Sequence, residues 1–274
     1  MNNVFSAKRF GKYFLYDLGN AKNNFGLSLL ILGFLPVIIF AVTQLMLLLS
    51  GNTEVTDPDA MTATRIITAI TVVAAMAIAC PVKLYGAVTD KRAGSSFLML
   101  PASIFEKWLS SMLIVLVVVP VLASLLYLGS DALLALIFPN RFGESILSMD
   151  IARIMEEEMG NYSVSFNGWG WLYAVWCPYA LAFFLGALLF KKGKVGKTIL
   201  AICALGMVTS FLVWGGVSIL GHFSENIRVW FESDGLIQGE KVIKTVIGTV
   251  KLFLALQVAA LMGLIYWRFR AIKH

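Results

Sequence analysis

Charged residues are scarce in this sequence. Only 14% of the 274 residues are Asp, Glu, Lys or Arg, whereas 59% are hydrophobic and the mean hydropathy is +0.82. Soluble domains carry about a quarter charged residues, and a chain this apolar cannot hide its surface in one soluble core. The composition therefore predicts an integral membrane protein. The formal net charge of +6 does not indicate a nucleic-acid partner, because no basic run with interleaved aromatic residues accompanies it.

Cysteine and histidine are also rare, which argues against disulfide and metal sites. The three cysteines, Cys80, Cys177 and Cys203, fall in apolar runs without CxxC or CxxxC spacing, so we interpret them as small buried hydrophobes. The two histidines, His222 and His274, are far apart, whereas a zinc protease needs a pair at helical spacing. We expect no metal and no other cofactor on this chain.

Enzyme motifs are missing as well. The segment GKVGKT at 193–198 ends like a phosphate-binding loop, but Lys191 stands where that loop has its first glycine. No GxSxG motif of a serine hydrolase is present. The acidic run Glu156–Glu158 is interpreted as the solvated face of a short surface helix. We therefore predict a non-catalytic protein with no catalytic residue of its own.

Long apolar runs dominate the rest of the chain and predict an all-α integral membrane protein. Aromatic residues on one face and basic residues on the other predict an interfacial amphipathic helix over 1–24, the alternative being an unstructured basic leader. Six transmembrane helices are expected at about 25–50, 66–88, 108–138, 169–190, 198–220 and 242–267, with 269–274 as a short tail.

Prolines and aromatic residues mark features within these spans. We expect Pro36 to kink the first span, and Cys80-Pro81 to break the second near its end. The third run exceeds the roughly twenty residues that a bilayer needs, so it must tilt, kink at Pro120 or emerge before Asp131. The fourth opens with an aromatic belt made of Trp169, Trp171, Tyr173 and Trp176.

Three charged residues fall within or beside the apolar runs. Asp131, Lys83 and Lys251 each lie near an expected helix end. Charges inside spans often mark ion pathways, yet long side chains near an interface extend to the headgroups. We favour snorkelling or a polar cavity wall for Lys251 over an ion site.

The distribution of basic residues predicts the orientation of the spans. With both termini cytoplasmic, the inside segments hold fifteen basic residues and the outside segments six. The inside set is Lys8, Arg9, Lys12, Lys22, Lys83, Lys91, Arg92, Lys107, Lys191, Lys192, Lys194, Lys197, Arg268, Arg270 and Lys273, and the outside set is Arg65, Arg141, Arg153, Arg228, Lys241 and Lys244. We therefore expect cytoplasmic N- and C-termini.

The connector between the second and third spans, 90–107, lies on that inner side. Gly94 is expected to end the second helix. Ser103 and Glu106 form a capping box that starts the third. Taken alone, these residues describe a well-made helix corner. The apolar run 97–100 indicates more, because a cytoplasmic loop exposes such residues only where it docks on a membrane or a partner.

The segment FLMLPASIFEKWLSSML at 97–113 resembles the LPAS-x-x-EK segment found between the second and third spans of bacterial ABC-2 type transporter membrane subunits. The six-span layout, the cytoplasmic termini and the interfacial helix agree with that family. The resemblance implies a permease subunit of the bacterial inner membrane, paired with a separate ATPase subunit and with a second permease copy or homologue. The chain departs from the family at 224–240, which is polar where many members carry apolar re-entrant helices.

In such a transporter the connector is the coupling helix that seats in a groove of the ATPase. By resemblance the contacting residues are Asp90, Lys91, Arg92, Phe97, Leu100, Pro101, Ser103, Glu106 and Lys107. Phe97 and Leu100 supply the apolar contacts, whereas Asp90, Lys91, Arg92 and Glu106 supply polar ones. Two other functions stay open: an intramembrane enzyme with an unrecognised site, and a membrane sensor or assembly protein without transport.

Overall fold

Helices make up every regular element of the described chain. The computed structural model describes residues 5–51, 58–90, 94, 97, 99–148, 168–223 and 237–272. The elements are α1 (Ala7–Gly33), α2 (Leu35–Ser50), α3 (Pro58–Tyr85), η1 (Gly86–Thr89), α5 (Ile104–Leu113), η2 (Ile114–Val118), α6 (Val119–Ile137), α7 (Pro139–Phe142), α9 (Gly168–Leu189), α10 (Lys194–Phe223) and α12 (Ile237–Ala271).

Five of the described helical segments are long and apolar enough to cross a membrane, and a sixth arises if the bent pair α1–α2 is one span. The segments α5, η2 and α6 together form one of the five. The protein is therefore an all-α, multi-pass membrane protein, as the composition predicts.

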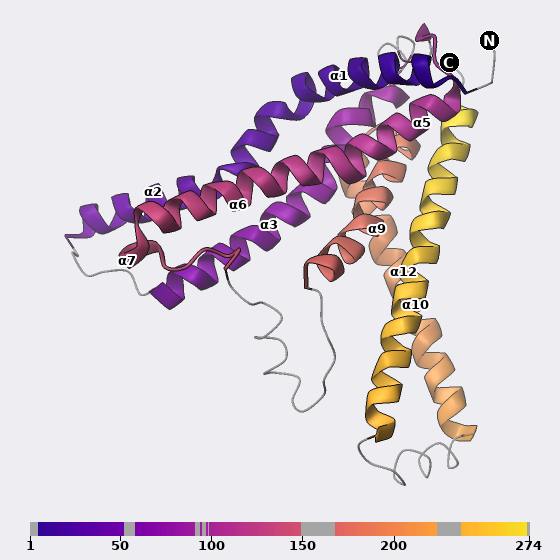
Figure 1. The fold of residues 1–274 in the computed structure, drawn as a ribbon. Coiled ribbons are helices and arrows are strands. Elements are labelled where there is room, and N and C mark those ends of the chain that lie inside the picture. Colours follow the sequence, from indigo (N-terminus) through magenta and orange to yellow (C-terminus); the bar gives the residue numbers. More distant parts are fainter. Residues whose placement is uncertain are drawn as a thin grey trace.

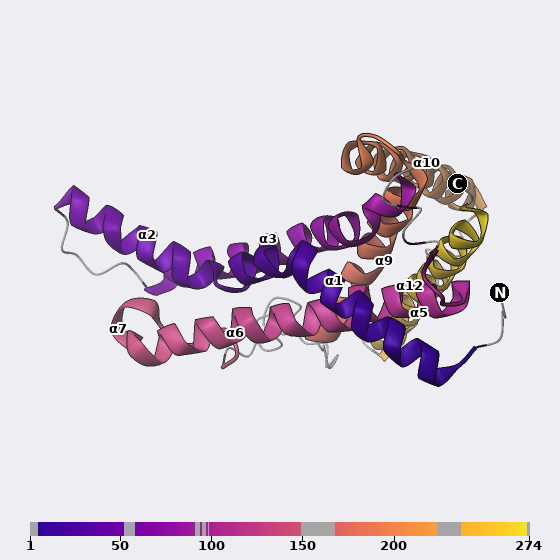
Figure 2. The ribbon, with the colours of Figure 1, turned by 90° about the horizontal axis from the view of Figure 1, so that it is seen from above.

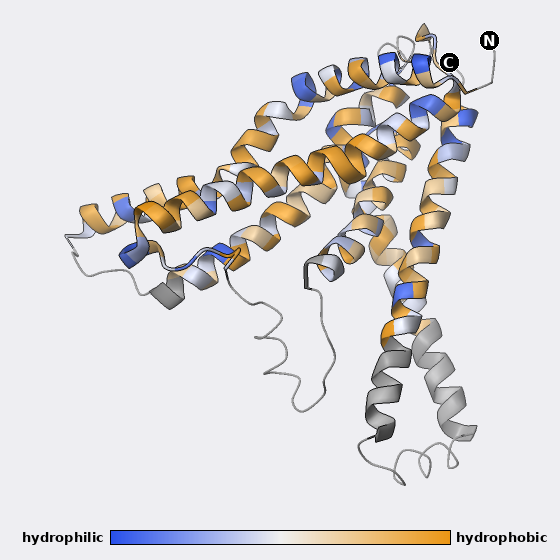
Figure 3. Ribbon diagram, in the orientation of Figure 1, coloured by the Kyte–Doolittle hydropathy of each residue, from blue (hydrophilic) through white to orange (hydrophobic). Residues whose placement is uncertain are grey.

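The spans diverge from one end of the molecule in two arms (Figure 1). One arm contains α1, α2, α3 and α6, and the other contains α9, α10 and α12 (Figure 2). Helix α9 joins the arms, because it packs against α3 as well as against α12. The start of α1, the start of α5 and the end of α12 meet at the shared end (Figure 1). We call this the connector end, and apolar residues cover most of the helices that leave it (Figure 3).

The first two helices differ from their expected bounds. No helix boundary occurs at 24/25, where we expected the interfacial helix to give way to the first span; α1 is continuous to Gly33. The chain bends by 47° at Phe34, just before Pro36 at the start of α2. Because proline cannot donate a backbone hydrogen bond, we attribute the bend to Pro36. Ser130 Oγ of α6 donates to Gly33 O at 3.0 Å and satisfies one carbonyl at this bend.

The expected break at Pro81 does not occur. Helix α3 runs through Pro81 to Tyr85, and the 3₁₀ turn η1 follows it. A membrane helix can continue through a proline where neighbouring helices pack around it. Pro81 is fully buried, so it lies in such a position. Lys83 lies in the last turn of α3, and its Nζ donates to Ser28 Oγ of α1 at 2.6 Å. Gly94 lies nine residues beyond the end of α3 and does not cap it.

Asp131 lies near the end of α6, as expected, but it has a buried partner that the sequence did not reveal. It is fully buried, and a two-pronged ion pair joins it to Arg65 of α3, with Nε–Oδ1 and Nη2–Oδ2 distances of 2.9 and 2.8 Å. Arg65 Nη1 also donates to the carbonyls of Phe142 and Glu144, and Ile146 N donates to Asp131. The pair ties α3, α6 and the segment after α7 together, although Arg65 was assigned to an outside loop.

Two of the three cysteines behave as predicted. Cys80 and Cys177 are buried, whereas Cys203 is exposed on α10. Cys80 belongs to the core where α3, α5–α6 and α9 meet, together with Ile114, Leu181 and Phe184.

Candidate functional site at the connector end

The capping box at the start of α5 is confirmed. Ser103 Oγ accepts from Glu106 N at 3.2 Å, and Glu106 Oε2 accepts from Ser103 N at 2.9 Å. The same carboxylate binds the N-terminal helix: Arg9 donates Nε to Oε2 at 2.7 Å and Nη2 to Oε1 at 2.6 Å, and Ser6 N donates to Oε1 at 3.0 Å. Glu106 is fully buried. Its carboxylate joins α1 to α5, and its side chain has no exposed surface in this structure.

Lys107 and Phe97 are also turned toward the protein. Lys107 is 5% exposed, donates Nζ to Phe97 O at 2.7 Å and lies 4.9 Å above the Phe97 ring. The Phe97 ring stacks on Phe269 near the end of α12, with centroids 5.8 Å apart. The exposure expected for 97–100 is therefore wrong at Phe97, which is half-buried.

Other members of the expected set reach the surface. Met99 is 80% exposed and Pro101 is exposed, whereas Leu100 is half-buried, as Phe97 is. The Asp90 side chain is 52% exposed and lies 3.4 Å from Lys194 Nζ at the start of α10. Ser103 is buried as the helix cap. Lys91 and Arg92 lie outside the described residues.

Lys194 gives the connector end a further link. Its Nζ donates to Gly86 O in η1 as well as lying near Asp90. At the opposite side, Trp108 Nε1 of α5 donates to Met262 O of α12 at 3.2 Å. The segment between α3 and α5, together with the start of α5, is thus joined to α1, α10 and α12, which are distant in sequence.

Asp17 is a residue that the sequence analysis missed. It is 5% exposed, and its Oδ2 accepts from Tyr85 Oη at 2.9 Å and from Ser110 Oγ at 2.6 Å. The sequence signal for Asp17 was its spacing, one helical turn after Tyr13 and two turns before Phe25. In the structure both of these aromatic residues are buried. An acidic residue on the apolar face of a helix indicates a buried partner.

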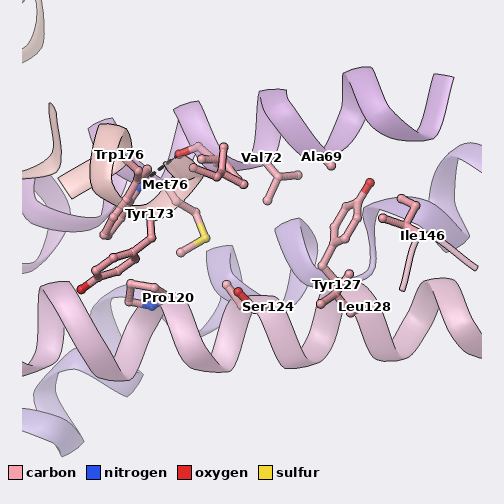
Figure 4. A pocket seen from close by; sticks show the side chains of 13 residues that line it. Ala69, Val72, Met76, Pro120, Ser124, Tyr127, Leu128, Ile146, Tyr173 and Trp176 are labelled. Atoms are coloured by element: carbon pink, nitrogen blue, oxygen red, sulfur yellow. Dashed lines mark hydrogen bonds between the residues drawn. The ribbon is translucent and has the colours of Figure 1, made fainter. Parts of the chain in front are cut away.

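An apolar cavity lies deeper in the molecule, between α3, α6 and α9 (Figure 4). Its volume is about 160 Å³. The polar groups of its larger side chains are used by the protein itself: Tyr173 Oη donates to Leu116 O, Tyr127 Oη to Arg65 O and Trp176 Nε1 to Val73 O. The cavity therefore offers mainly carbon to an occupant. Cavities of this size and character take small apolar groups.

The aromatic belt expected at the start of α9 is only partly on the surface. Tyr173 is 45% exposed, but Trp176 is buried at 7% and faces the cavity (Figure 4). The side chain of Trp169 and the run Glu156–Glu158 lie outside the described residues.

No family model, no curated protein and no solved structure matches this chain.

Proposed function

We propose that this protein is the membrane-spanning permease subunit of an ABC-2 type transporter, which couples ATP hydrolysis by a separate ATPase subunit to export of a substrate. The motif at 97–113 suggests the family. One structural observation carries the proposal furthest: the segment from Asp90 to Ser103 presents Met99 at the surface while Glu106, Phe97 and Lys194 fasten its neighbourhood to three other helices.

Such fastening is what a coupling surface requires. Coupling between distant sites is carried by packed side chains and hydrogen-bonded networks. A displacement of the connector pulls on α1 through Glu106–Arg9, on α12 through Phe97–Phe269 and on α10 through Lys194. The partner surface consists of Asp90, Met99, Leu100 and Pro101, and not of Glu106 or Lys107.

The cavity between α3, α6 and α9 supports a substrate with an apolar part. Its lining is carbon-rich, and α9 joins the two arms at this point. A lipid-like, peptide or drug-like molecule with a small apolar group fits that chemistry, because apolar burial favours its entry.

Co-purification tests the proposal. The tagged chain is isolated from its native membranes in mild detergent, and the retained proteins are identified by mass spectrometry and assayed for ATP hydrolysis. We expect one ATP-hydrolysing subunit in stoichiometric amount. Met99→Asp should weaken its retention by roughly thirtyfold, because a charge placed at an interface centre costs about 2 kcal/mol.

Leu147→Asp is the matched control, since Leu147 is 65% exposed and lies outside the connector end. This variant should retain the ATPase. Absence of any ATP-hydrolysing partner from the wild-type preparation, or equal retention by both variants, contradicts the proposal and favours a membrane enzyme or sensor.

A further inference from the structure

A single cation faces an apolar groove in the second arm. Lys251 lies within α12, and the next basic residue along that helix is Arg268. Its side chain is exposed, and its Nζ lies 5.9 Å from the centre of the Trp171 ring of α9. Within the described residues it forms no ion pair with a carboxylate. A lysine in this setting attracts an anion.

The groove beside Lys251 is formed by one face of each of two helices. Trp171, Ala174 and Cys177 line it from α9, and Lys251, Leu254 and Val258 line it from α12. The spacings of three and four residues place each set on one helical face. The volume is about 520 Å³, and below the ammonium group the lining is apolar. The groove therefore combines one positive charge with a hydrocarbon-like track, which is the chemistry of an anionic amphiphile.

The depth of Lys251 agrees with a lipid of one leaflet. Arg268, at the connector end, follows Lys251 by 17 residues, which corresponds to about 26 Å along an α-helix. Trp267 and Arg268 are typical of a membrane interface. Because the hydrocarbon core is about 30 Å thick, Lys251 lies near the headgroups of the opposite leaflet. The groove runs from Lys251 toward the connector end, which is the direction of an acyl chain in that leaflet.

We propose that the groove between α9 and α12 binds an anionic phospholipid of the leaflet opposite the connector, with its phosphate on Lys251 and one acyl chain along Leu254 and Val258. Charge complementarity selects the headgroup, and apolar contact holds the chain. The site is separate from the connector and does not depend on the transport function proposed above.

Native mass spectrometry of the delipidated full chain tests this site. The protein is titrated with phosphatidylglycerol or with phosphatidylcholine of identical acyl chains. We expect the first lipid bound to be phosphatidylglycerol, with about fivefold preference, since one lysine near a surface contributes about that factor. Lys251→Gln should remove the preference. Lys197→Gln, which removes an exposed lysine at the start of α10, should keep it.

A second pair of variants tests the apolar part without changing charge. Ala255→Trp places a large side chain in the groove and should abolish the first binding event for both lipids. Ala260→Trp adds the same bulk to an exposed position outside the groove and should leave binding intact. Thermal unfolding of each variant confirms that it is folded.

Three results overturn the site. Equal losses in Lys251→Gln and Lys197→Gln mean that boundary lipid binds by charge alone. Unchanged binding in Ala255→Trp means that the chain does not lie in the groove. If the lipid-free wild type is a dimer and lipid-free Lys251→Gln is a monomer, a second copy of the chain covers this face.

Discussion

Gly186 shows how closely the second arm is packed at the level of single residues. A Cβ atom added to Gly186 of α9 would overlap Thr198 Oγ1 of α10 and would lie 2.8 Å from Thr198 Cβ. We expect Gly186→Ala to cost about 1–3 kcal/mol of unfolding free energy, because overpacking forces the helices apart. Thermal unfolding in detergent, followed by circular dichroism, measures the loss.

Gly206→Ala is the control for that substitution. No atom lies within 4 Å of a Cβ built at Gly206, which is also in a helix. The control should be neutral or slightly stabilising, since alanine is the better helix former. The double variant Gly186→Ala, Thr198→Gly should recover part of the loss. If Gly186→Ala has the same melting temperature as the wild type, then α9 and α10 do not pack closely at Gly186.

The Arg65–Asp131 pair leads to a second prediction at the residue scale. Both side chains are at most 2% exposed, so removing one charge leaves the other buried without an opposite charge. We expect Asp131→Asn to cost about 3–5 kcal/mol. The double variant Arg65→Leu, Asp131→Leu should cost less than Asp131→Asn alone, because it leaves no unpaired charge.

Glu144→Gln serves as the matched control here, because the Glu144 side chain is exposed and only its backbone carbonyl accepts from Arg65. The melting temperatures of Asp131→Asn, the double Leu variant and Glu144→Gln measure these stability changes. A double variant less stable than Asp131→Asn would contradict the ion-pair account.

These residues also show what a sequence reveals about a site and what it hides. The Ser103–Glu106 capping box was predictable because its two residues are three apart and need only a helix start. The partners of Glu106 and Asp131 were not, since Arg9 and Arg65 lie 97 and 66 residues away. Topology alone brings such pairs together, so burial of Glu106 could not be foreseen from its neighbours.

At the scale of elements, the span α5–η2–α6 departs from regular helix near Pro120, and α9 donates a hydrogen bond there. The helix passes through a π-helical turn at Ile114–Val118, just before Pro120. Proline at 120 has no N–H, so it cannot serve Leu116 O in α-helical register or Val115 O in the register of the π turn, in which Val119 N donates to Ile114 O. Tyr173 Oη of α9 donates to Leu116 O at 2.7 Å. The hydroxyl thus joins η2 to α9 beside the apolar cavity (Figure 4).

Tyr173→Phe should therefore cost about 1 kcal/mol, because it removes the hydrogen bond from Tyr173 Oη to Leu116 O. The cost should shrink in a Pro120→Ala background, where the restored amide can serve Leu116 O. A double-mutant cycle on melting temperature measures this coupling. Equal losses from Tyr173→Phe in both backgrounds would show that the tyrosine acts through packing alone.

Element boundaries were predicted well where composition decides them and poorly where packing decides them. The fourth span, expected at 169–190, is α9 from Gly168 to Leu189. In contrast, α1 continues nine residues past its expected end, and Pro81 does not interrupt α3. Apolar length is a local property, whereas the effect of a proline depends on what neighbouring helices cover.

At the scale of the whole molecule, the start of α1, the connector and the end of α12 meet at one end (Figure 1), together with basic side chains such as Arg9, Lys107, Lys194 and Arg268. Fifteen basic residues fall in the segments assigned to this side and six in the others. The positive-inside rule then predicts a cytoplasmic connector end.

Cysteine labelling tests that orientation. In a Cys203→Ser background, where the remaining Cys80 and Cys177 are buried, Met99→Cys and Asn140→Cys place single exposed thiols at the connector end and in α7. A membrane-impermeant maleimide applied to intact cells or spheroplasts should label Asn140→Cys and not Met99→Cys. Permeabilised membranes should label both. Labelling of Met99→Cys from outside would reverse the topology. It would also contradict the ATPase partner proposed above, because ATP is present in the cytoplasm.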